Sequence, residues 1–195
     1  MILYGASGHA KVIIDILEAL GTPSDFLVDD NPSISSLLGY EVRRDFGTYE
    51  SAIMSIGSSH IRRQIVERLE VKHWGKAVHP HAIVSPHASI GEGTVVMAGV
   101  VINSGAVIGK HCIVNTGATI DHDCVVGDYV HIAPGAHISG GVVIGNGSWI
   151  GVGSCVKQKI KIGKSVTIGA GAAVVKDIQD GVTAVGVPAN NIIEY

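Results

Sequence analysis

An aliphatic, β-branched residue stands at every sixth position of the chain from Val84 to Val174. The members of this series are Val84, Ile90, Val96, Ile102, Ile108, Val114, Ile120, Val126, Ile132, Ile138, Ile144, Ile150, Val156, Ile162, Ile168 and Val174. Two residues before most of them the side chain is small, as in Ala106, Cys112 and Ala118. Inward positions repeat about every 3.6 residues in an α-helix and about every 2 residues in a strand, so neither element explains this period. The pattern predicts a parallel β-helix in which each hexad supplies one short strand and one turn.

Residues three hexads apart are expected to stack in successive coils, so the sequence also indicates what faces outward. One outward column reads Val107, Val125 and Val143 before it changes to Lys161. A second outward column consists of Val95, Ile113, His131, Trp149 and Thr167, in which Trp149 is expected to stack on His131. A line of valines would form an unusually large apolar patch on a monomer. We therefore expect a closed oligomer that buries the Val107 column.

Residues 1–78 lack the six-residue period and read as a separate unit. The expected strands are 1–4, 26–28 and 52–56, and the expected helices are 11–20 and 59–69, the second with Ile61 and Ile65 on its buried side. Strands that alternate with helices imply a small, Rossmann-like parallel sheet. The predicted organisation is an α/β nucleotide-binding domain at 1–78 followed by a β-helix domain at 79–195.

The turn Gly5–His9 lies between the first strand and the first helix. Free backbone N–H groups and the positive end of the helix suit a phosphate there. Asp29 and Asp30 end the second strand, where an acid commonly holds a ribose hydroxyl. The glycines follow G-x-x-G and not the full dinucleotide pattern, so we expect a single nucleotide. A purely structural turn is the alternative interpretation.

Composition excludes several classes of protein. A formal net charge of −3 gives no reason to expect nucleic acid as a partner. The first residues read as a strand and a turn rather than a signal peptide, and no apolar run approaches the length of a membrane span. Cys112 and Cys124 occupy small inward positions of the repeat, so disulfides are not implied. We expect a cytoplasmic protein without membrane insertion.

Asp121, His122 and Asp123 form the most polar turn of the predicted β-helix, at a corner beside the Val107 column. A histidine at such a corner is often an ordinary surface residue. Flanking carboxylates, however, can orient an imidazole and raise its basicity. If the valine column packs on a neighbouring chain, His122 opens into the groove between the two. The pair His79 and His81, at the junction of the two units, is interpreted as a solvated linker rather than a metal site.

Four stretches together point to a family. They are the hexads from residue 82 to 175, the closing Gly186-Val-Pro-Ala189, the opening Tyr4-Gly-Ala-Ser-Gly-His9, and the segment Asn115-Thr-Gly-Ala-Thr-Ile-Asp-His122-Asp123. In combination they resemble the bacterial sugar acyltransferases typified by PglD and NeuD. The resemblance covers essentially the whole chain and implies that the β-helix is left-handed. The general rule for parallel crossovers would have predicted right-handed coils.

The resemblance also implies an activity and a set of site residues. PglD-like enzymes are homotrimers with active sites at the subunit interface, and they move an acetyl group from acetyl-CoA to the 4-amino group of a UDP-linked 4-amino-4,6-dideoxy sugar. The implied general base is His122, tuned by Asp123 where PglD has a Glu. The implied nucleotide-sugar contacts are Ser7, Gly8, His9, Asp29, Asp30 and Gly57, the implied acetyl-CoA contacts are His131, Val152 and Ala170, and no metal is expected.

Three other functions stay open at this point. One is O-acetylation of a sialic acid or another sugar, as in NeuD. Another is a metalloenzyme of the γ-carbonic-anhydrase type, which shares the coil and for which His111, His131 and His137 are the candidate ligands. The third is a non-catalytic β-helix that serves as a scaffold or binding module. The sequence names neither the sugar nor its nucleotide.

Overall fold

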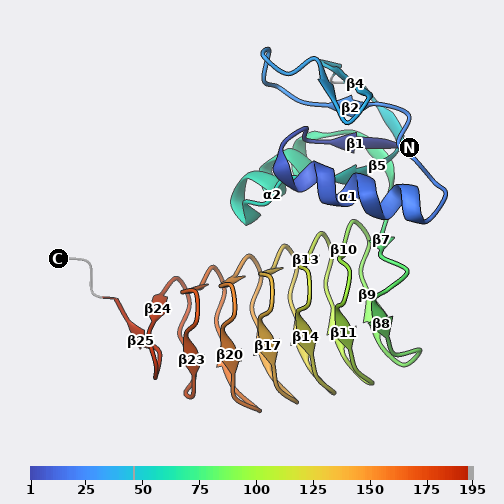
Figure 1. Cartoon of the computed structure of the whole chain (residues 1–195). Helices are drawn as coiled ribbons and strands as arrows, with labels where there is room; N and C mark the ends of the chain where they lie inside the picture. The colour runs from blue at the N-terminus through green and yellow to red at the C-terminus, as the bar shows by residue number, and fades with distance from the viewer. Residues whose placement is uncertain (46, 193–195) are drawn as a thin grey trace.

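The computed structural model describes residues 1–45 and 47–192, which form an α/β domain seated on one side of a β-helix (Figure 1). The N-terminal elements are β1 (Ile2–Tyr4), α1 (Gly8–Ala19), β2 (Leu27–Val28), β3 (Ser36–Leu37), β4 (Tyr40–Arg43), β5 (Tyr49–Met54), α2 (Ser59–Arg68) and β6 (Val71–Trp74). The strands lie in the order β3-β4-β2-β1-β5-β6, and every pair from β4 to β6 is parallel. The predicted parallel sheet is confirmed. The antiparallel β3–β4 pair and β6 were not expected, because their sequences lack a clear apolar pattern.

Each face of this sheet is covered by its own helix. Ile13 and Leu17 of α1 belong to the apolar cluster that contains Leu3 of β1. On the opposite face, Ile65 of α2 packs on the cluster that contains Tyr4. Alternate residues of one strand therefore face different helices, as the pleat of a strand requires. This packing holds the carboxyl ends of β1, β2 and β5 at one edge of the sheet.

The β-helix has three sheets within the described range 77–192, and they are parallel except for the final β24–β25 pair. The docking face consists of β7 (Ala77–Val78), β10 (Val95–Val96), β13 (Ile113–Val114), β16 (His131–Ile132), β19 (Trp149–Ile150), β22 (Thr167–Ile168) and β24 (Thr183–Val185), with β25 (Asn190–Asn191) at its edge. The lateral face consists of β8 (Ile83–Val84), β11 (Val101–Ile102), β14 (Thr119–Ile120), β17 (His137–Ile138), β20 (Cys155–Val156) and β23 (Ala173–Val174). The valine face consists of β9 (Ser89–Ile90), β12 (Val107–Ile108), β15 (Val125–Val126), β18 (Val143–Ile144) and β21 (Lys161–Ile162). The parallel β-helix predicted from the hexads is confirmed, and so is the left hand that the family resemblance implied.

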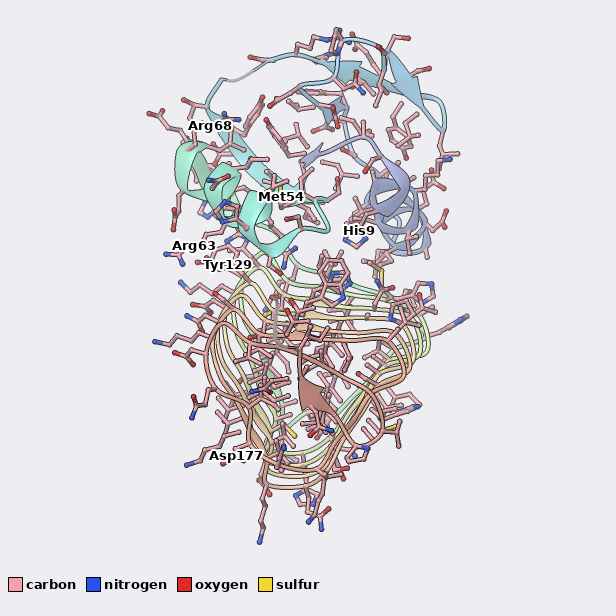
Figure 2. All side chains as sticks on the ribbon, turned by 90° about the vertical axis from the view of Figure 1, so that its left-hand side faces the viewer. His9, Met54, Arg63, Arg68, Tyr129 and Asp177 are labelled. Carbon is pink, nitrogen blue, oxygen red and sulfur yellow. The ribbon has the colours of Figure 1, made fainter. Side chains whose placement is uncertain are left out.

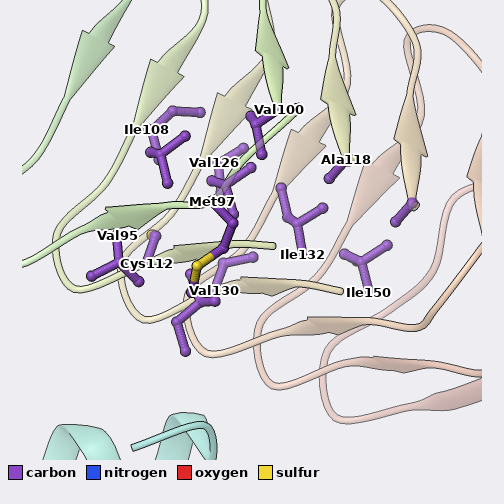
Figure 3. Close-up of a cluster of buried hydrophobic side chains, with 14 of the residues drawn as sticks. Val95, Met97, Val100, Ile108, Cys112, Ala118, Val126, Val130, Ile132 and Ile150 are labelled. Carbon is purple, nitrogen blue, oxygen red and sulfur yellow. The ribbon is translucent and has the colours of Figure 1, made fainter. Parts of the chain in front are cut away.

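The interior of the β-helix is built by the hexads as expected. Figure 3 shows Ile108, Val126 and Ile132 inside the coils together with small residues such as Cys112 and Ala118, and all five are buried. Cys112 and Cys124 are buried free thiols, and Cys155 is an exposed one. The register changes only near the end: Ile162 pairs with Ile144 on one side and with Ile178 on the other, so the last coil is two residues shorter.

The two outward columns differ sharply. Val107 and Val125 of the valine face are 46% and 44% exposed, as expected. Val95 and Ile113 of the docking face are only 1% exposed, which contradicts the expectation that this column is solvent-facing. The reason is that the N-terminal domain rests on the docking face and covers its first coils. β7 pairs with β10, so the first strand of the β-helix lies just before residue 79. The domain boundary at residue 79 stays a prediction.

Arg62 joins the two domains. It is 1% exposed, and its guanidinium donates to the carbonyls of Ile56, Gly57, His111 and Tyr129 at 2.8–2.9 Å. The last two carbonyls belong to the β-helix, so one buried cation bridges α2 and two successive coils. Burial lowers the pKa of Arg62 to about 10, still well above neutrality, so the side chain stays charged. The prediction that Ile61 lies on the buried side of α2 was wrong, since Ile61 is 47% exposed and the helix turns Arg62 inward instead.

No helix in the described part of the chain combines the length and the apolarity that a membrane crossing requires.

Candidate active site

The corner between the lateral face and the valine face carries Asp121, His122 and Asp123, and we call it the His122 corner. Nδ1 of His122 lies 2.8 Å from Oδ2 of Asp123, and the backbone N–H of His122 donates to Oδ1 of Asp121 at 2.8 Å. The hydrogen bond to Asp123 raises the pKa of His122, and the charge of Asp121 adds to the effect. With Nδ1 engaged, Nε2 is the ring nitrogen that can meet a substrate. The corner therefore presents an exposed imidazole held by carboxylates.

The local sequence explains this geometry. Asp123 has φ 59°, a left-handed turn conformation that Asp tolerates better than most residues, and this turn brings its carboxylate back to the ring of His122. Asp121 is itself held by Asn103, whose Nδ2 donates to Oδ1 of Asp121 at 2.9 Å from the preceding coil. That hydrogen bond is the main reason why the pKa of Asp121 is lowered. The acid stays ionised beside His122.

A groove of about 300 Å³ runs over the lateral face beside this corner. Its lining combines the apolar Val101 and Ile138 with the polar residues Asn103, Thr119, Asp121, His137 and Ser139. Thr119 and His137 are joined at 2.9 Å between Oγ1 and Nδ1. The groove gives a polar substrate room to approach His122.

A second group of predicted residues lies at the carboxyl edge of the N-terminal sheet. Gly5 has φ 106°, and a Cβ there would lie 2.6 Å from Oγ of Ser55, so the turn after β1 requires glycine. Oδ2 of Asp29 accepts the N–H of Ala6 at 2.7 Å, which ties that turn to the end of β2. The structure thus brings Asp29 and the glycine turn together. Part of the hydrogen-bonding capacity of Asp29 is used by the turn itself.

The neighbours of Asp29 lie at the same edge of the sheet. Ser7 is the N-cap of α1 but makes no side-chain capping bond, and Ser7 and Gly8 are exposed, so the first turn of the helix is accessible to an anion. Asp30 accepts a hydrogen bond from the hydroxyl of Tyr4 at 2.8 Å. The pKa of Tyr4 is raised to about 12, mainly because the hydroxyl is buried and secondly because it bonds to Asp30. The predicted substrate contacts of this domain line one edge of the sheet, where parallel α/β sheets commonly bind ligands.

His9 and His131 meet where the two domains touch. Their ring centroids are 6.3 Å apart, and the ring of His131 is stacked on Trp149 at 4.6 Å, as expected. Nε2 of His131 lies 3.2 Å from the amide nitrogen of Asn115, and Nδ1 lies 3.3 Å from the carbonyl oxygen of Gly57. These partners suit a neutral ring that accepts from Asn115 and donates to Gly57. Burial lowers the pKa of both His9 and His131 to about 4, so both are neutral at pH 7.

Val152 and Ala170 lie on a different corner, between the docking face and the lateral face, which we call the amide corner. They are stacked in successive coils, since the N–H of Gly171 donates to the carbonyl of Val152 at 2.8 Å. Both are exposed. Within the described residues, no protein acceptor occupies the backbone N–H of Val152 or Ala170, while the flanking N–H groups of Gly151 and Gly153 are bonded. The structure does not group His131 with them, because its side chain is buried beneath the N-terminal domain.

The His122 corner lies on the side of the β-helix opposite the N-terminal domain. A three-sided coil places the corner between two faces across from the third face, which here is the docking face. Figure 2 looks along the β-helix. It shows His9 and Arg63 at the domain junction, and Asp177, beside the valine face, on the side of the coil away from the N-terminal domain. A single chain therefore separates the carboxyl edge of its N-terminal sheet from the His122 corner.

The candidate ligands of the metalloenzyme hypothesis are also separated. His111 and His131 are 3% and 6% exposed beneath the N-terminal domain, while His137 lies exposed on the lateral face. Among the described residues, no group of three His, Cys, Asp or Glu side chains is placed to hold a metal ion. The buried pair is closed to a neighbouring chain as well, so these positions do not favour that hypothesis.

Comparison with known proteins gives matches over both domains. Residues 1–69 match the PglD N-terminal domain, and residues 87–122 and 105–140 match the bacterial transferase hexapeptide family of six repeats. The acetyltransferase domain of PglB from Neisseria gonorrhoeae is 41% identical, with 98% of each chain covered and a TM-score of 0.89, and it has also been solved with acetyl coenzyme A. A histidine variant of perosamine N-acetyltransferase from Caulobacter crescentus, solved with CoA and GDP-perosamine, is 36% identical, with 99% of this chain and 96% of that chain covered and a TM-score of 0.91.

A curated relative matches over a shorter stretch. UDP-N-acetylbacillosamine N-acetyltransferase from Bacillus subtilis is 46% identical over 51 residues. The match spans 24% of this chain and only 22% of that relative.

Proposed function

Because this chain belongs to the family of PglD-like bacterial sugar acetyltransferases, we propose that it transfers the acetyl group of acetyl-CoA to the amino group of a nucleotide-linked amino sugar in glycan biosynthesis. The strongest support is the similarity, over nearly the whole chain, to an enzyme solved with both CoA and a GDP-linked amino sugar. Two of the named relatives are N-acetyltransferases, which favours nitrogen over the oxygen of the NeuD-like alternative. We propose a 4-amino-4,6-dideoxy sugar, with UDP as the expected nucleotide.

His122 is proposed as the general base. As the sugar nitrogen forms its bond to the acetyl carbon, Nε2 of His122 takes the proton that the nitrogen must lose, and the carbon–sulfur bond breaks. Asp123 accepts from Nδ1–H and stabilises the imidazolium that results. The proton then passes to the departing thiolate, which leaves as CoA. No covalent acyl-enzyme is needed, because a deprotonated amine is itself a competent nucleophile.

The other two groups of residues bind the substrates in this proposal. The sheet edge that carries Ser7, Gly8, His9, Asp29, Asp30 and Gly57 would hold the nucleotide sugar. The open N–H groups of Val152 and Ala170 would donate to the amides of the pantetheine arm, since a backbone donor on a rigid coil needs no reorganisation. His131 is kept as the third proposed contact of acetyl-CoA, with its side chain already held by Asn115 and Gly57.

A direct assay tests the proposed reaction. The purified protein is incubated with acetyl-CoA and, in parallel, with UDP-, GDP- and dTDP-linked 4-amino sugars, and the products are analysed by mass spectrometry. We expect one acetyl group on the amino nitrogen of the UDP-linked sugar. Acetylation of a sialic acid hydroxyl, with none of the amines modified, would favour the O-acetyl alternative.

The cytoplasmic location stays a prediction.

We propose that the protein is a homotrimer whose active sites lie between chains. The placement of the His122 corner opposite the N-terminal domain supports this, because two chains are needed to bring His122 and the proposed nucleotide-sugar contacts to one substrate. The exposed valine face adjoins the same corner and is an apolar surface suited to burial. A closed ring of identical chains would cover it in every copy.

Val125→Glu is expected to dissociate this trimer. Val125 is 44% exposed in the single chain, and burying an unpaired carboxylate at its place would cost several kcal/mol per chain. Val187→Glu, at a position that is 77% exposed away from the valine face, is the matched control and should leave the assembly intact. Light scattering measures the mass. A wild-type protein that is monomeric at micromolar concentration and still active would contradict the proposal.

Asp29→Ala is expected to raise the KM for the nucleotide sugar about tenfold or more and to spare the KM for acetyl-CoA, because one charge-assisted hydrogen bond to the ribose would be lost. Asp29→Asn keeps an oxygen for the N–H of Ala6 and removes the charge, although it gives up the oxygen that accepts the N–H of Asn31. Asp15→Ala on the exposed side of α1 is the control. Steady-state kinetics with each substrate varied in turn gives both constants. Equal effects on the two KM values would argue against this assignment.

A further inference from the structure

The imidazole of His122 rests on a glycine of the next coil. An ideal Cβ built on Gly140 would lie 2.6 Å from Nε2 and 2.7 Å from Cε1 of His122. Real carbon atoms do not approach so closely without one of the groups moving. The half of the ring that carries Nε2 thus occupies the space that any side chain at position 140 would need.

The other residues in the same column show that the missing side chain is specific to position 140. One residue per coil occupies the same place on the His122 corner, in the order Ser104, His122, Gly140 and Gln158. Gly140 is the member of this column without a side chain, and it directly follows His122. The backbone conformation of Gly140 lies outside the left-handed region, so its own φ does not demand glycine. The fold alone therefore gives no reason for a glycine at this position.

The backbone around Gly140 is fixed on both sides. The N–H of Gly141 donates to the carbonyl of His122 at 2.9 Å, and the N–H of Lys159 donates to the carbonyl of Gly140 at 2.9 Å. These ladder bonds hold the corners of three successive coils in register. A Cβ at position 140 would have to be accommodated by the imidazole, which is the free end of an exposed side chain, and not by the main chain.

We propose that Gly140 is a positioning residue, whose bare Cα lets the imidazole of His122 lie flat along the corner with Nδ1 on Asp123 and Nε2 toward the substrate groove. A larger residue would swing the ring away from Asp123 and from the position where Nε2 meets the substrate amine. The catalytic consequence of this inference rests on the proposed role of His122 as general base. The geometric part concerns the ring alone and can be tested without any substrate.

Gly140→Ala should separate activity from stability. We expect kcat to fall about 10- to 100-fold, the usual consequence of misplacing a catalytic group by about 1 Å, with little change in either KM. The melting temperature should stay the same or rise slightly, since alanine restricts the unfolded chain and the folded backbone accepts it. Gln158→Ala, one coil further in the same column, is the matched control and should change neither quantity.

Two measurements show whether Gly140 acts through His122. First, NMR titration of the His122 ring, assigned by its loss in His122→Ala, should give a lower pKa in Gly140→Ala than in the wild type, because the contact with Asp123 is weakened. Second, Gly140→Ala introduced into His122→Ala should cause no further loss of kcat. An unchanged titration, or an equal loss of kcat in both backgrounds, would overturn the proposal. If His122→Ala is fully active but the titration still shifts, the positioning of the ring stands and the general-base assignment fails.

Discussion

His122→Ala is expected to lower kcat by about 10²- to 10⁴-fold, the usual contribution of a general base, with modest changes in both KM values. The sugar amine must lose a proton as it attacks the thioester, and the variant leaves no imidazole at the exposed corner to accept it. His87→Ala is the matched control, because this exposed histidine lies on the same corner two coils earlier. Single-turnover and steady-state rates at pH 7 measure the effect. A variant that retains more than about a third of wild-type kcat would place the base elsewhere.

The pH dependence of the rate gives an independent check on Asp123. The neutral form of His122 acts as the base, so the rate should rise as pH increases through the pKa of His122. Asp123 raises that pKa, hence Asp123→Asn should move the rising limb of the profile to lower pH. The plateau should also fall, because the amide no longer stabilises the imidazolium. A limb that stays in place would show that Asp123 is not paired with the catalytic group.

Arg62→Met should be the most destabilising of these substitutions. It keeps a long apolar stem but removes the donors for the carbonyls of Ile56, Gly57, His111 and Tyr129. Hydrogen bonds from a charged group contribute about 1.5–3 kcal/mol each, so we expect a loss of about 3 kcal/mol or more even if water reaches some of the carbonyls. Urea unfolding followed by circular dichroism and by limited proteolysis between residues 70 and 80 measures it.

Arg63→Met is the natural control for this substitution. Arg63 is the next residue of α2, but its side chain is exposed: it pairs with Glu67 one turn further along the helix, and its guanidinium lies 6.0 Å from the centroid of the Tyr129 ring. Exposed pairs of this kind contribute about 0.3–0.5 kcal/mol. If the two variants unfold at the same urea concentration, Arg62 does not hold the domains together.

Most of the fold could be predicted from the sequence because its core is periodic. An unbroken series of β-branched residues leaves only one regular way to bury all of them, and the structure confirms the three-sided coil and its small inward partners. The parallel sheet of the first domain was also predictable from its alternating strands and helices. The handedness of the coil was not, since the general rule for crossovers predicts the opposite hand.

The features that sequence reasoning missed depend on contacts between distant segments. Arg62 was missed because a helical stripe of aliphatic residues predicts Ile61 and Ile65 inside, and only the carbonyls of the docked β-helix make a buried guanidinium favourable. Asn115 and Gly140 were missed for a similar reason, because each acts on a histidine that lies 16 or 18 residues away. The sequence does place Gly140 three hexads after His122, in the same column. The repeat does not indicate, however, that the imidazole of His122 packs against the next coil. The roles of His122, Asp123 and the binding residues stay predictions.

The regular coils, of which only the last is shortened, restrict how such a chain can change in length during evolution. Between Val84 and Val174 an insertion or deletion within the strands keeps every later strand on its own face only if it adds or removes a complete coil, because a single added or lost hexad would move each later strand to the next face. A complete coil inserted between His122 and Ala170 would in turn shift the amide corner along the axis relative to the histidine. The one departure from the register, at Ile178, falls after the last proposed binding residue. Variation in length among descendants of this gene should therefore collect beyond Val174 and in the loops of the first domain, while the stretch between them keeps its length.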